Sequence, residues 1–283
     1  MARFFGRPSF PPLPREVVMG MPDWTDRNAY AWTKNLALRE WAWEFLRRNP
    51  DFQAAWQLAR LEYGIAGYYA QTMMVMSQHQ VPSLSSWGCL YCSSPEQDSR
   101  EAAVFWSPDI CPSVLRLNAF CLTQKVEATP FLLREIVSPS ILLEMPAEPQ
   151  HLFFREGGYG LQLLINGADV TKAVRLVADA APNHALAKPQ LRSLQCFNDL
   201  RLAGRLRSSH VQRDILSARW GVVLQALDAS LAGASQKEIA RCLFAYYSEE
   251  GWRSPDRWLR FRVRNAVRRG YMLMRRGYRN LLS

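Results

Sequence analysis

The stretch "HLFFREGGYGLQLLING" (residues 151–167) decides the fold class, because two apolar runs flank Glu156-Gly157-Gly158. Runs of this kind around a glycine turn are typical of a β-hairpin. Three shorter runs with turn residues between them precede it: "AAVFWSP" (102–108), "SVLRLNAF" (113–120) and "SPSILLEMPA" (138–147). We therefore expect strands over roughly 102–168, with helices returning from Val170.

Towards the N-terminus the pattern changes to helical spacing rich in tryptophan, from Met21 to about Gln80. One helix is expected over Leu38–Arg48, and Asn49-Pro50 ends it. Asp51 begins a second helix. The apolar residues at helical spacing are Trp41, Phe45 and Leu46 in the first helix and Phe52, Trp56, Ala59 and Tyr63 in the second. Aromatic stripes at this spacing are typical of a buried core rather than of a base-stacking surface.

The chain is long enough for two domains or three small ones. Its composition, 48% hydrophobic and 21% charged, is that of a soluble globular protein. The sequence predicts an α+β fold with a helical N-terminal domain, a central antiparallel β segment and a C-terminal helical variant helix-turn-helix. The expected divisions are a flexible arm (1–20), a helical domain (21–80), a linker (81–100), a β-rich segment (101–170) and a C-terminal helical domain (171–283).

Positive charge is concentrated at the C-terminus. Ten arginines and one acid, Asp256, lie in residues 252–283, so this segment carries about +9 of the formal net charge of +10. A basic surface this local indicates a polyanionic partner, and nucleic acid is the commonest.

The basic segment is predicted to be a helix. Ser254-Pro255-Asp256 has the capping residue, proline and acid typical of a helix start, and the helix should run from Arg257 to about Arg276. At 100° per residue one side carries Leu259, Val263, Ala266, Val267, Gly270 and Met274. The opposite side carries Arg257, Arg260, Arg264, Arg268 and Arg275, and one flank carries Arg262, Arg269 and Arg276. Gly270 lies in the apolar stripe, where a missing side chain permits close packing.

Other interpretations of the basic face are an acidic protein partner, a plain solvated surface and a membrane-surface helix. Acids would be expected on a solvated face to balance the arginines, and they are absent. The preceding helices offer the apolar stripe a better partner than a membrane. DNA contact is therefore the favoured interpretation.

Two helices are expected before the basic one. The first runs over roughly His210–Leu231, and the second begins at Ser235, where S-x-x-E with Glu238 forms a capping box. Ile239, Ala240, Leu243 and Phe244 supply its buried face. The order of the three helices predicts a variant helix-turn-helix, with the basic helix as the reader of the major groove. It is a variant because about nine residues (245–253) replace the usual short turn.

Metal and catalytic motifs are weak. Cys89 and Cys92 form C-x-x-C, with His79 nearby and Cys111 or Cys121 as further candidates, but a second ligand pair is missing. G-x-S-x-G, H-E-x-x-H and P-loop motifs do not occur, and Gly157-Gly158 lies in a hairpin. We expect no enzyme, no cofactor and no metal site. With no secretory signal and no apolar run of 18 residues, a cytoplasmic location is expected.

Two blocks carry a family resemblance. "PDWTDRNAYAWTKNLALREWAWEFLRRNPDFQAAW" (22–56) resembles the transcriptional-regulator-like domain of proteobacteria. "LDASLAGASQKEIARCLF" and "RVRNAVRRGYMLMRRGYRNLL" resemble the variant helix-turn-helix of excision activators of integrative and conjugative elements. "WGCLYC" and "VFWSPDICPSVLRL" are similar to the family's middle segment. The two-domain order resembles that of the frameshifted excision activators, here in one continuous chain.

The resemblance implies a promoter-binding activator of excision and transfer genes, with double-stranded DNA as its partner. A small antiactivator protein that shares the variant domain is a second implied partner. Whether the N-terminal domain contacts DNA, a second copy or RNA polymerase stays open. The alternatives are an antiactivator-like interaction module and an accessory protein of replication or excision. The candidate DNA-binding residues are Gln236, Lys237, Arg257, Arg260, Arg264, Arg268, Arg269 and Arg275.

Overall fold

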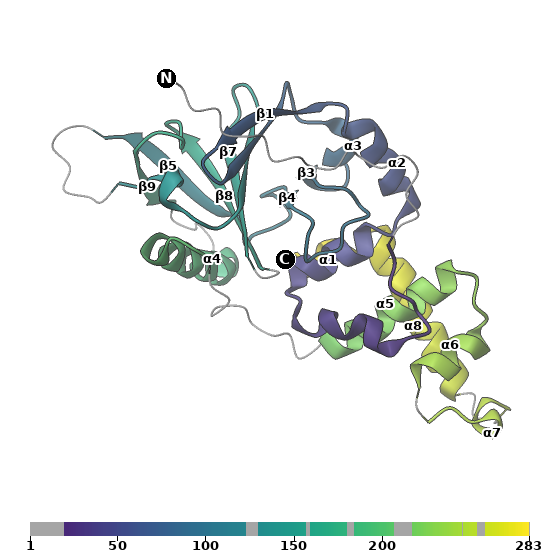
Figure 1. Cartoon of the computed structure of the whole chain (residues 1–283). Helices are drawn as coiled ribbons and strands as arrows, with labels where there is room; N and C mark the ends of the chain where they lie inside the picture. Colours follow the sequence, from purple (N-terminus) through teal and green to yellow (C-terminus); the bar gives the residue numbers. More distant parts are fainter. Residues whose placement is uncertain are drawn as a thin grey trace, which may run out of the picture.

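The computed structural model describes residues 20–122, 130–156, 159–179, 184–206, 217–244, 246–253 and 258–282. Helices and a central sheet are combined, so the predicted α+β class is confirmed. Figure 1 shows the sheet at one end of the molecule, with α4 (His184–Ala203) beside it, and α6 (Gln236–Leu243) and α7 (Glu249–Arg253) at the opposite end.

The N-terminal helices form as their caps and breaks predict. The 3-10 helix η1 (Arg27–Asn35) is capped by Asp26, and α1 (Leu38–Leu46) follows it. Asn49 caps α2 (Pro50–Ala59) by accepting hydrogen bonds from the next two backbone amides. The predicted core residues that are buried here are Trp41, Phe45, Leu46, Phe52, Trp56 and Ala59. The aromatic stripe is therefore core, as the spacing indicates.

The helical prediction fails beyond residue 62. Strand β1 (Tyr63–Tyr69) and strand β2 (Thr72–Ser77) pair antiparallel, so Tyr63 lies on a strand and not on a helix face. Ala70 adopts a φ of 52° at the turn between them. β2 also pairs in parallel with β6 (Ser140–Glu144). This partner, distant in sequence, outweighs the local helical spacing, because pairing and burial decide strand formation.

Residues 81–100 are folded and do not form the predicted linker. They contain the short helix α3 (Pro82–Ser85) and strand β3 (Cys89–Cys92), which pairs with β4 (Val104–Trp106). The segment is tied to α1, because the Trp43 indole donates to the Gln97 carbonyl at 3.1 Å and the Ser99 amide donates to a Glu44 carboxylate oxygen at 2.6 Å. These two bonds use main-chain groups of the segment, so they hold its backbone against α1.

Among the described residues the main sheet has seven strands, in the order β1-β2-β6-β7-β8-β5-β9. The predicted hairpin is present as β7 (Gln150–Glu156) and β8 (Tyr159–Gly167), with Glu156 opposite Tyr159; Gly157 and Gly158 lie outside the described residues. The expected antiparallel segment is a mixed sheet, because β5 (Leu115–Cys121) pairs in parallel with β8. A turn in the sequence predicts antiparallel pairing between the two strands that it joins. Parallel strands are joined by a long crossover connection, which a turn does not predict.

Helices do not return at Val170, because β9 (Val174–Ala178) pairs with β5 at the sheet edge. After it, α4 covers one face of the sheet. Phe197 and Leu200 of α4 are buried in one hydrophobic cluster with Leu117 and Leu163. This second half of the sheet therefore has a core of its own.

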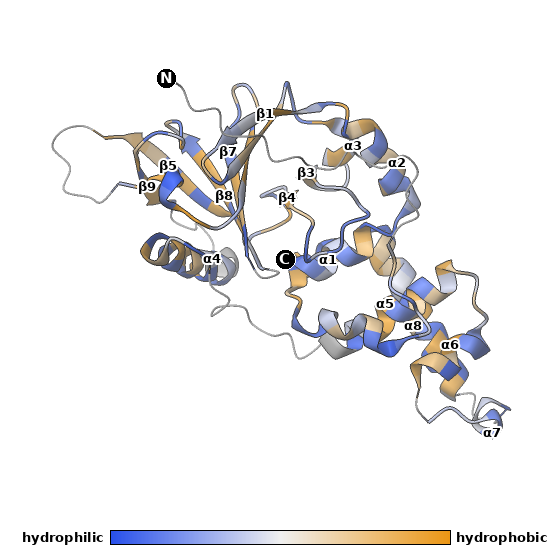
Figure 2. Ribbon diagram, viewed as in Figure 1, coloured by the Kyte–Doolittle hydropathy of each residue, from blue (hydrophilic) through white to orange (hydrophobic). Residues whose placement is uncertain are grey.

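The C-terminal helices are α5 (Ser217–Leu231), α6, α7, α8 (Trp258–Arg275) and the 3-10 helix η4 (Gly277–Leu281). The predicted start of the first helix at His210 lies outside the described residues, as do Ser254, Pro255, Asp256 and Arg257. The segment of about nine residues (245–253) expected between α6 and the basic helix, longer than the usual short turn, contains α7. Figure 2 shows hydrophobic and hydrophilic residues interleaved along α6 and α8, as expected of helices with one buried side.

The two ends of the chain share one core. Phe45 of α1 packs edge-on against Trp220 of α5, with 6.2 Å between ring centroids, and Tyr278 of η4 lies 6.1 Å from Trp106 of β4. These rings belong to one buried cluster that also holds Leu273. N-terminal and C-terminal helices therefore stabilise each other.

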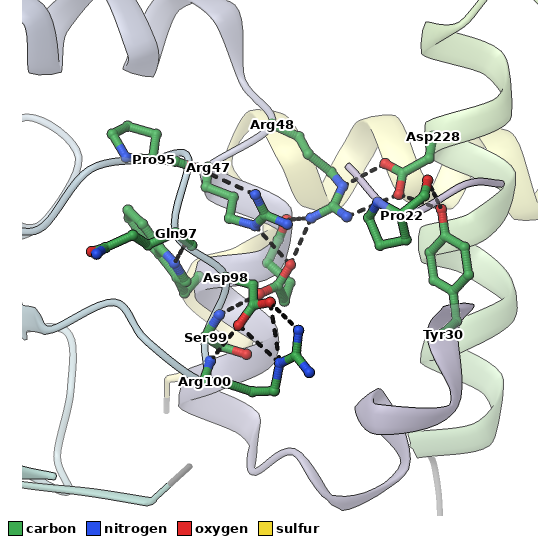
Figure 3. A network of polar contacts seen from close by, with 12 residues as sticks. Pro22, Tyr30, Arg47, Arg48, Pro95, Gln97, Asp98, Ser99, Arg100 and Asp228 are labelled. Atoms are coloured by element: carbon green, nitrogen blue, oxygen red, sulfur yellow. Dashed lines mark hydrogen bonds and ion pairs between the residues drawn. The ribbon is translucent and has the colours of Figure 1, made fainter. Parts of the chain in front are cut away.

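A buried ionic network reinforces this junction (Figure 3). Arg48 of α1's C-terminal end donates to both carboxylate oxygens of Asp228 on α5, at 2.5 and 2.9 Å, and Glu44 binds Arg48 at 2.8 Å and Arg47 at 2.7 Å. The Tyr30 hydroxyl donates to Asp228 at 2.7 Å. All four charged side chains are at most 1% exposed, and two cations balance two anions.

Candidate nucleic-acid interface

The basic helix α8 has one buried and one exposed side, as the spacing predicts. Its buried residues are Leu259, Val263, Gly270, Leu273 and Met274, whereas Ala266 and Val267 are half-buried. The N-terminal half packs on α5 and α6, and the C-terminal half packs on the core shared with α1. Both halves of the protein thus fix the orientation of the exposed side.

Gly270 permits the close approach of α8 to α5 that the sequence predicts. A Cβ atom at this position would lie 2.8 Å from the Leu227 Cβ and 3.3 Å from the Val223 carbonyl oxygen. Neither atom is the end of a flexible side chain, so a larger residue requires the helices to separate.

Helix α6 is fixed by the predicted capping box. The Glu238 amide donates to the Ser235 hydroxyl at 3.3 Å, and the Ser235 amide donates to a Glu238 carboxylate oxygen at 2.8 Å. The predicted face of α6, Ile239, Ala240, Leu243 and Phe244, is buried. It forms one cluster with residues of α5 and α8, so the three helices make a small unit.

The outer side of α8 carries unbalanced positive charge. Arg264, Arg268 and Arg275 are exposed, and none makes an ion pair with an acid of the described part of the chain. Arg260 is half-buried. Arg257, the fifth residue of the predicted row, lies outside the described residues. This row presents guanidinium groups to solvent along the helix.

The arginines on the flank of α8 stack on aromatic rings. The Arg269 guanidinium carbon lies 4.5 Å from the centroid of Trp220, and that of Arg262 lies 5.3 Å from Phe244 and 5.8 Å from Tyr246. Stacking orders a guanidinium and leaves its charge in place. Arg269 therefore has a fixed position beside the exposed row.

The two candidates on α6 differ in their surroundings. Gln236 is the first residue of α6 and is exposed. Lys237 is paired with Glu249 of α7 at 2.9 Å, and Glu249 also binds Arg241 at 2.5 Å. Hydrogen bonds from Lys237 and Arg241 lower the pKa of the Glu249 carboxyl to about 2.

Sequence reasoning did not predict the ion pairs of Glu249 with Lys237 and Arg241. The sequence shows basic residues in α6 and acidic residues in α7. It does not show that these side chains lie close together in the folded chain. Glu249 therefore balances part of the positive charge that Lys237 and Arg241 give to α6.

The cysteine pair is part of the core. Cys89 and Cys92 are buried in β3, and burial raises the pKa of both thiols. In the part of the chain that the structure describes, no three His, Cys, Asp or Glu side chains are grouped to hold a metal ion. Among the described helices, none has both the length and the apolar character that a membrane span requires.

Two protein-family models match the chain. Residues 175–283 match a model described as "T6SS, Transcription factor, DNA binding domain", which covers α4 to η4 and so includes α8. Residues 23–75 match a model described as "Proteobacterial transcriptional regulator-like domain", in agreement with the resemblance of residues 22–56. Curated proteins give no match.

Fold and matches together define the class of protein. They indicate a transcriptional regulator with a DNA-binding domain, and DNA is the partner that this domain implies. The exposed arginine row lies inside the matched DNA-binding region.

Proposed function

We infer that the protein is a sequence-specific transcriptional activator that binds double-stranded DNA through α8. The observation that carries this inference is the row of exposed, acid-free arginines within the region that matches a DNA-binding domain. In this function Arg264 and Arg268 face base edges, where a guanidinium binds guanine in two places. Arg262 and Arg269, on the flank of α8, neutralise phosphates.

The packing of α5, α6 and α8 supports docking as a variant helix-turn-helix. α8 has 18 residues, which is about 27 Å of helix, and the major groove, about 12 Å wide, admits a helix of this kind. α6 is held against α8 by the cluster around Ile239 and Leu259. In this docking α6 is the supporting helix, and Gln236 and Lys237 at its N-terminal end contact the DNA backbone.

Two sets of target genes are supported by different observations. The sequence resemblance supports excision and transfer genes of an integrative and conjugative element. The description of the matched DNA-binding model supports genes of the T6SS. We propose the first set, with a small antiactivator and RNA polymerase as protein partners, a bacterial cytoplasmic location at the nucleoid, and no catalytic activity. Capture of genomic DNA distinguishes the two sets.

A second candidate function is a protein-interaction module. Three exposed aromatic residues favour it, because Tyr246, Trp258 and Phe261 are 49%, 41% and 63% exposed at the N-terminal end of α8. Aromatic side chains and arginines are enriched in protein interfaces. In this alternative the basic face binds an acidic regulator, and DNA affinity stays at the non-specific level.

The test is affinity capture of fragmented host DNA on the purified protein near physiological salt, followed by sequencing. Arg264→Ala/Arg268→Ala is the test variant. Arg134→Ala/Lys172→Ala is the matched control, since it removes two exposed positive charges outside the matched DNA-binding region. Sharp peaks upstream of element genes, lost only in the test variant, are the expected result. Equal recovery of all fragments by folded protein would favour the interaction module, and DNA bending without promoter activation would favour an accessory role in replication or excision.

A further inference from the structure

A basic groove lies at the C-terminal end of α8. Its volume is about 1020 Å³. α8 and η4 form one side, and α3 and the start of α2 form the other. Its lining residues include four arginines, Arg268, Arg275, Arg276 and Arg279, and the aromatic residues Trp87 and Tyr271.

The charge of this groove is strongly unbalanced. Asp51 is the one acid among the lining residues of the described chain. Arg268, Arg275 and Arg276 are exposed and make no ion pair with a described acid. The C-terminal end of α8 favours nearby cations through its dipole, which lowers the cost of this accumulation.

A buried donor in the groove is left without a partner. Arg279 donates from Nη2 to the Ser86 carbonyl at 2.6 Å, and this fixes the side chain across the groove. Its Nε is buried and has no hydrogen-bond partner. Buried donors are normally bonded, so an unbonded one at a basic surface indicates a place for an anion or an ordered water.

The walls of the groove are fixed by bonds between the two ends of the chain. The Tyr278 hydroxyl donates to the Trp87 carbonyl at 2.6 Å, and the Asn49 amide donates to the Met274 carbonyl at 3.2 Å. Tyr278 is fully buried. The groove thus exists before any ligand binds, and rigid sites lose less entropy on binding.

We propose that this groove binds phosphates of the DNA backbone beside the bases that α8 reads, with Arg275, Arg276 and Arg279 as the phosphate contacts. The proposal rests on the proposed function and extends the DNA surface to residues of the N-terminal half. Asn49, Ser86 and Trp87 then lie alongside the duplex, so the regulator-like half contacts DNA directly.

Continuity with the arginine row favours backbone phosphates over a free phosphate compound. Arg268 belongs both to the row and to the groove. Arg264 and Arg275 are eleven residues apart, which is about 16 Å of helix axis and the length of about five base pairs. A duplex bound at the middle of α8 therefore has phosphates close to the C-terminal end of α8.

The test is the salt dependence of binding to a fluorescent 30-base-pair duplex, measured by anisotropy between about 50 and 200 mM salt. Each phosphate contact contributes about 0.9 to the slope of log affinity against log salt. Arg275→Ala/Arg276→Ala should flatten the slope by about 1.8, so its affinity falls about twelve-fold less over this range than that of the wild type. Arg134→Ala/Lys172→Ala should keep the wild-type slope.

Three outcomes are decisive, and circular dichroism and melting curves first establish that each variant is folded. If the Arg275/Arg276 variant and the control have the same salt slope for duplex binding, the groove does not bind phosphates of the DNA. The proposed function still stands in that case if Arg264→Ala/Arg268→Ala weakens binding. Wild-type protein without salt-dependent binding to any duplex refutes the proposed function itself. In the third outcome, inorganic pyrophosphate raises the melting temperature of the wild type but not of the Arg275/Arg276 variant, while both proteins show the same salt slope for duplex binding. This outcome assigns the groove to a free anion and overturns the proposal.

Discussion

Asp228→Asn tests whether the buried ionic network joins the two ends of the chain. The substitution keeps the size of the side chain and removes its charge. Arg48 then keeps one acid, Glu44, which it shares with Arg47. The network changes from two cations and two anions to two cations and one anion, all of them at most 1% exposed.

The expected cost follows from this burial. Removing one partner of a buried ion pair leaves an uncompensated charge and costs about 3–5 kcal/mol. An exposed pair contributes less than about 1 kcal/mol. Since natural domains are stable by about 5–15 kcal/mol, the substitution removes a large fraction of the free energy of unfolding.

Urea unfolding measures this loss, followed by tryptophan fluorescence and circular dichroism. The control is Lys172→Gln, which breaks an exposed pair with Asp169 at 3.8 Å and should leave the midpoint almost unchanged. The double variant Arg48→Met/Asp228→Leu replaces one ion pair by apolar side chains and leaves Glu44 with Arg47, so it should be more stable than Asp228→Asn alone. A cost below about 1 kcal/mol for Asp228→Asn, the range of exposed pairs, would refute the reasoning.

Three further predictions concern charge, pH and packing. Glu249→Gln releases Lys237 and Arg241, so it should steepen the salt dependence of duplex binding with little change in melting temperature; an unchanged slope would show that these cations face away from DNA. Burial lowers the pKa of His151 to about 4, so the unfolded chain binds a proton at higher pH than the folded one. Stability should therefore fall by about 2 kcal/mol from pH 7.5 to 5, and His151→Phe should remove that part of the pH dependence in urea titrations. Gly270→Ala should destabilise by about 1 kcal/mol, because overpacking against Leu227 outweighs the gain in helix propensity, whereas Gly64→Ala, with open space around it, should not.

Local sequence signals predicted the elements that depend on local physics. The capping box at Ser235, the Asn49-Pro50 break and the hairpin after Glu156 all act within a few residues, and all are present. The apolar stripe of α8 was predictable for the same reason, since the repeat of 3.6 residues per turn places its residues on one side of the helix. The exposed side of α8 followed from the stripe.

Contacts between distant residues explain what the sequence did not predict. β2 forms because it pairs with β6, and β9 forms because it pairs with β5. Arg47 and Arg48 have the pattern of solvated cations at a helix end, and only Asp228, 180 residues away, explains the burial of Arg48. The basic groove forms because η4 lies beside α3, and the spacing of residues along the chain does not predict that contact.

α8 connects the packing of the two halves to the proposed DNA surface. Its N-terminal half packs on α5 and α6, its C-terminal half packs on the core shared with α1, and its exposed side carries the arginines. A partner that binds the N-terminal helices changes DNA affinity only if its binding favours a different position of α8 from the one described. The buried pair of Arg48 and Asp228 opposes such a shift, so variants that weaken it should make DNA affinity more sensitive to a partner. Rigidity at this junction is therefore the property that a regulatory partner has to overcome.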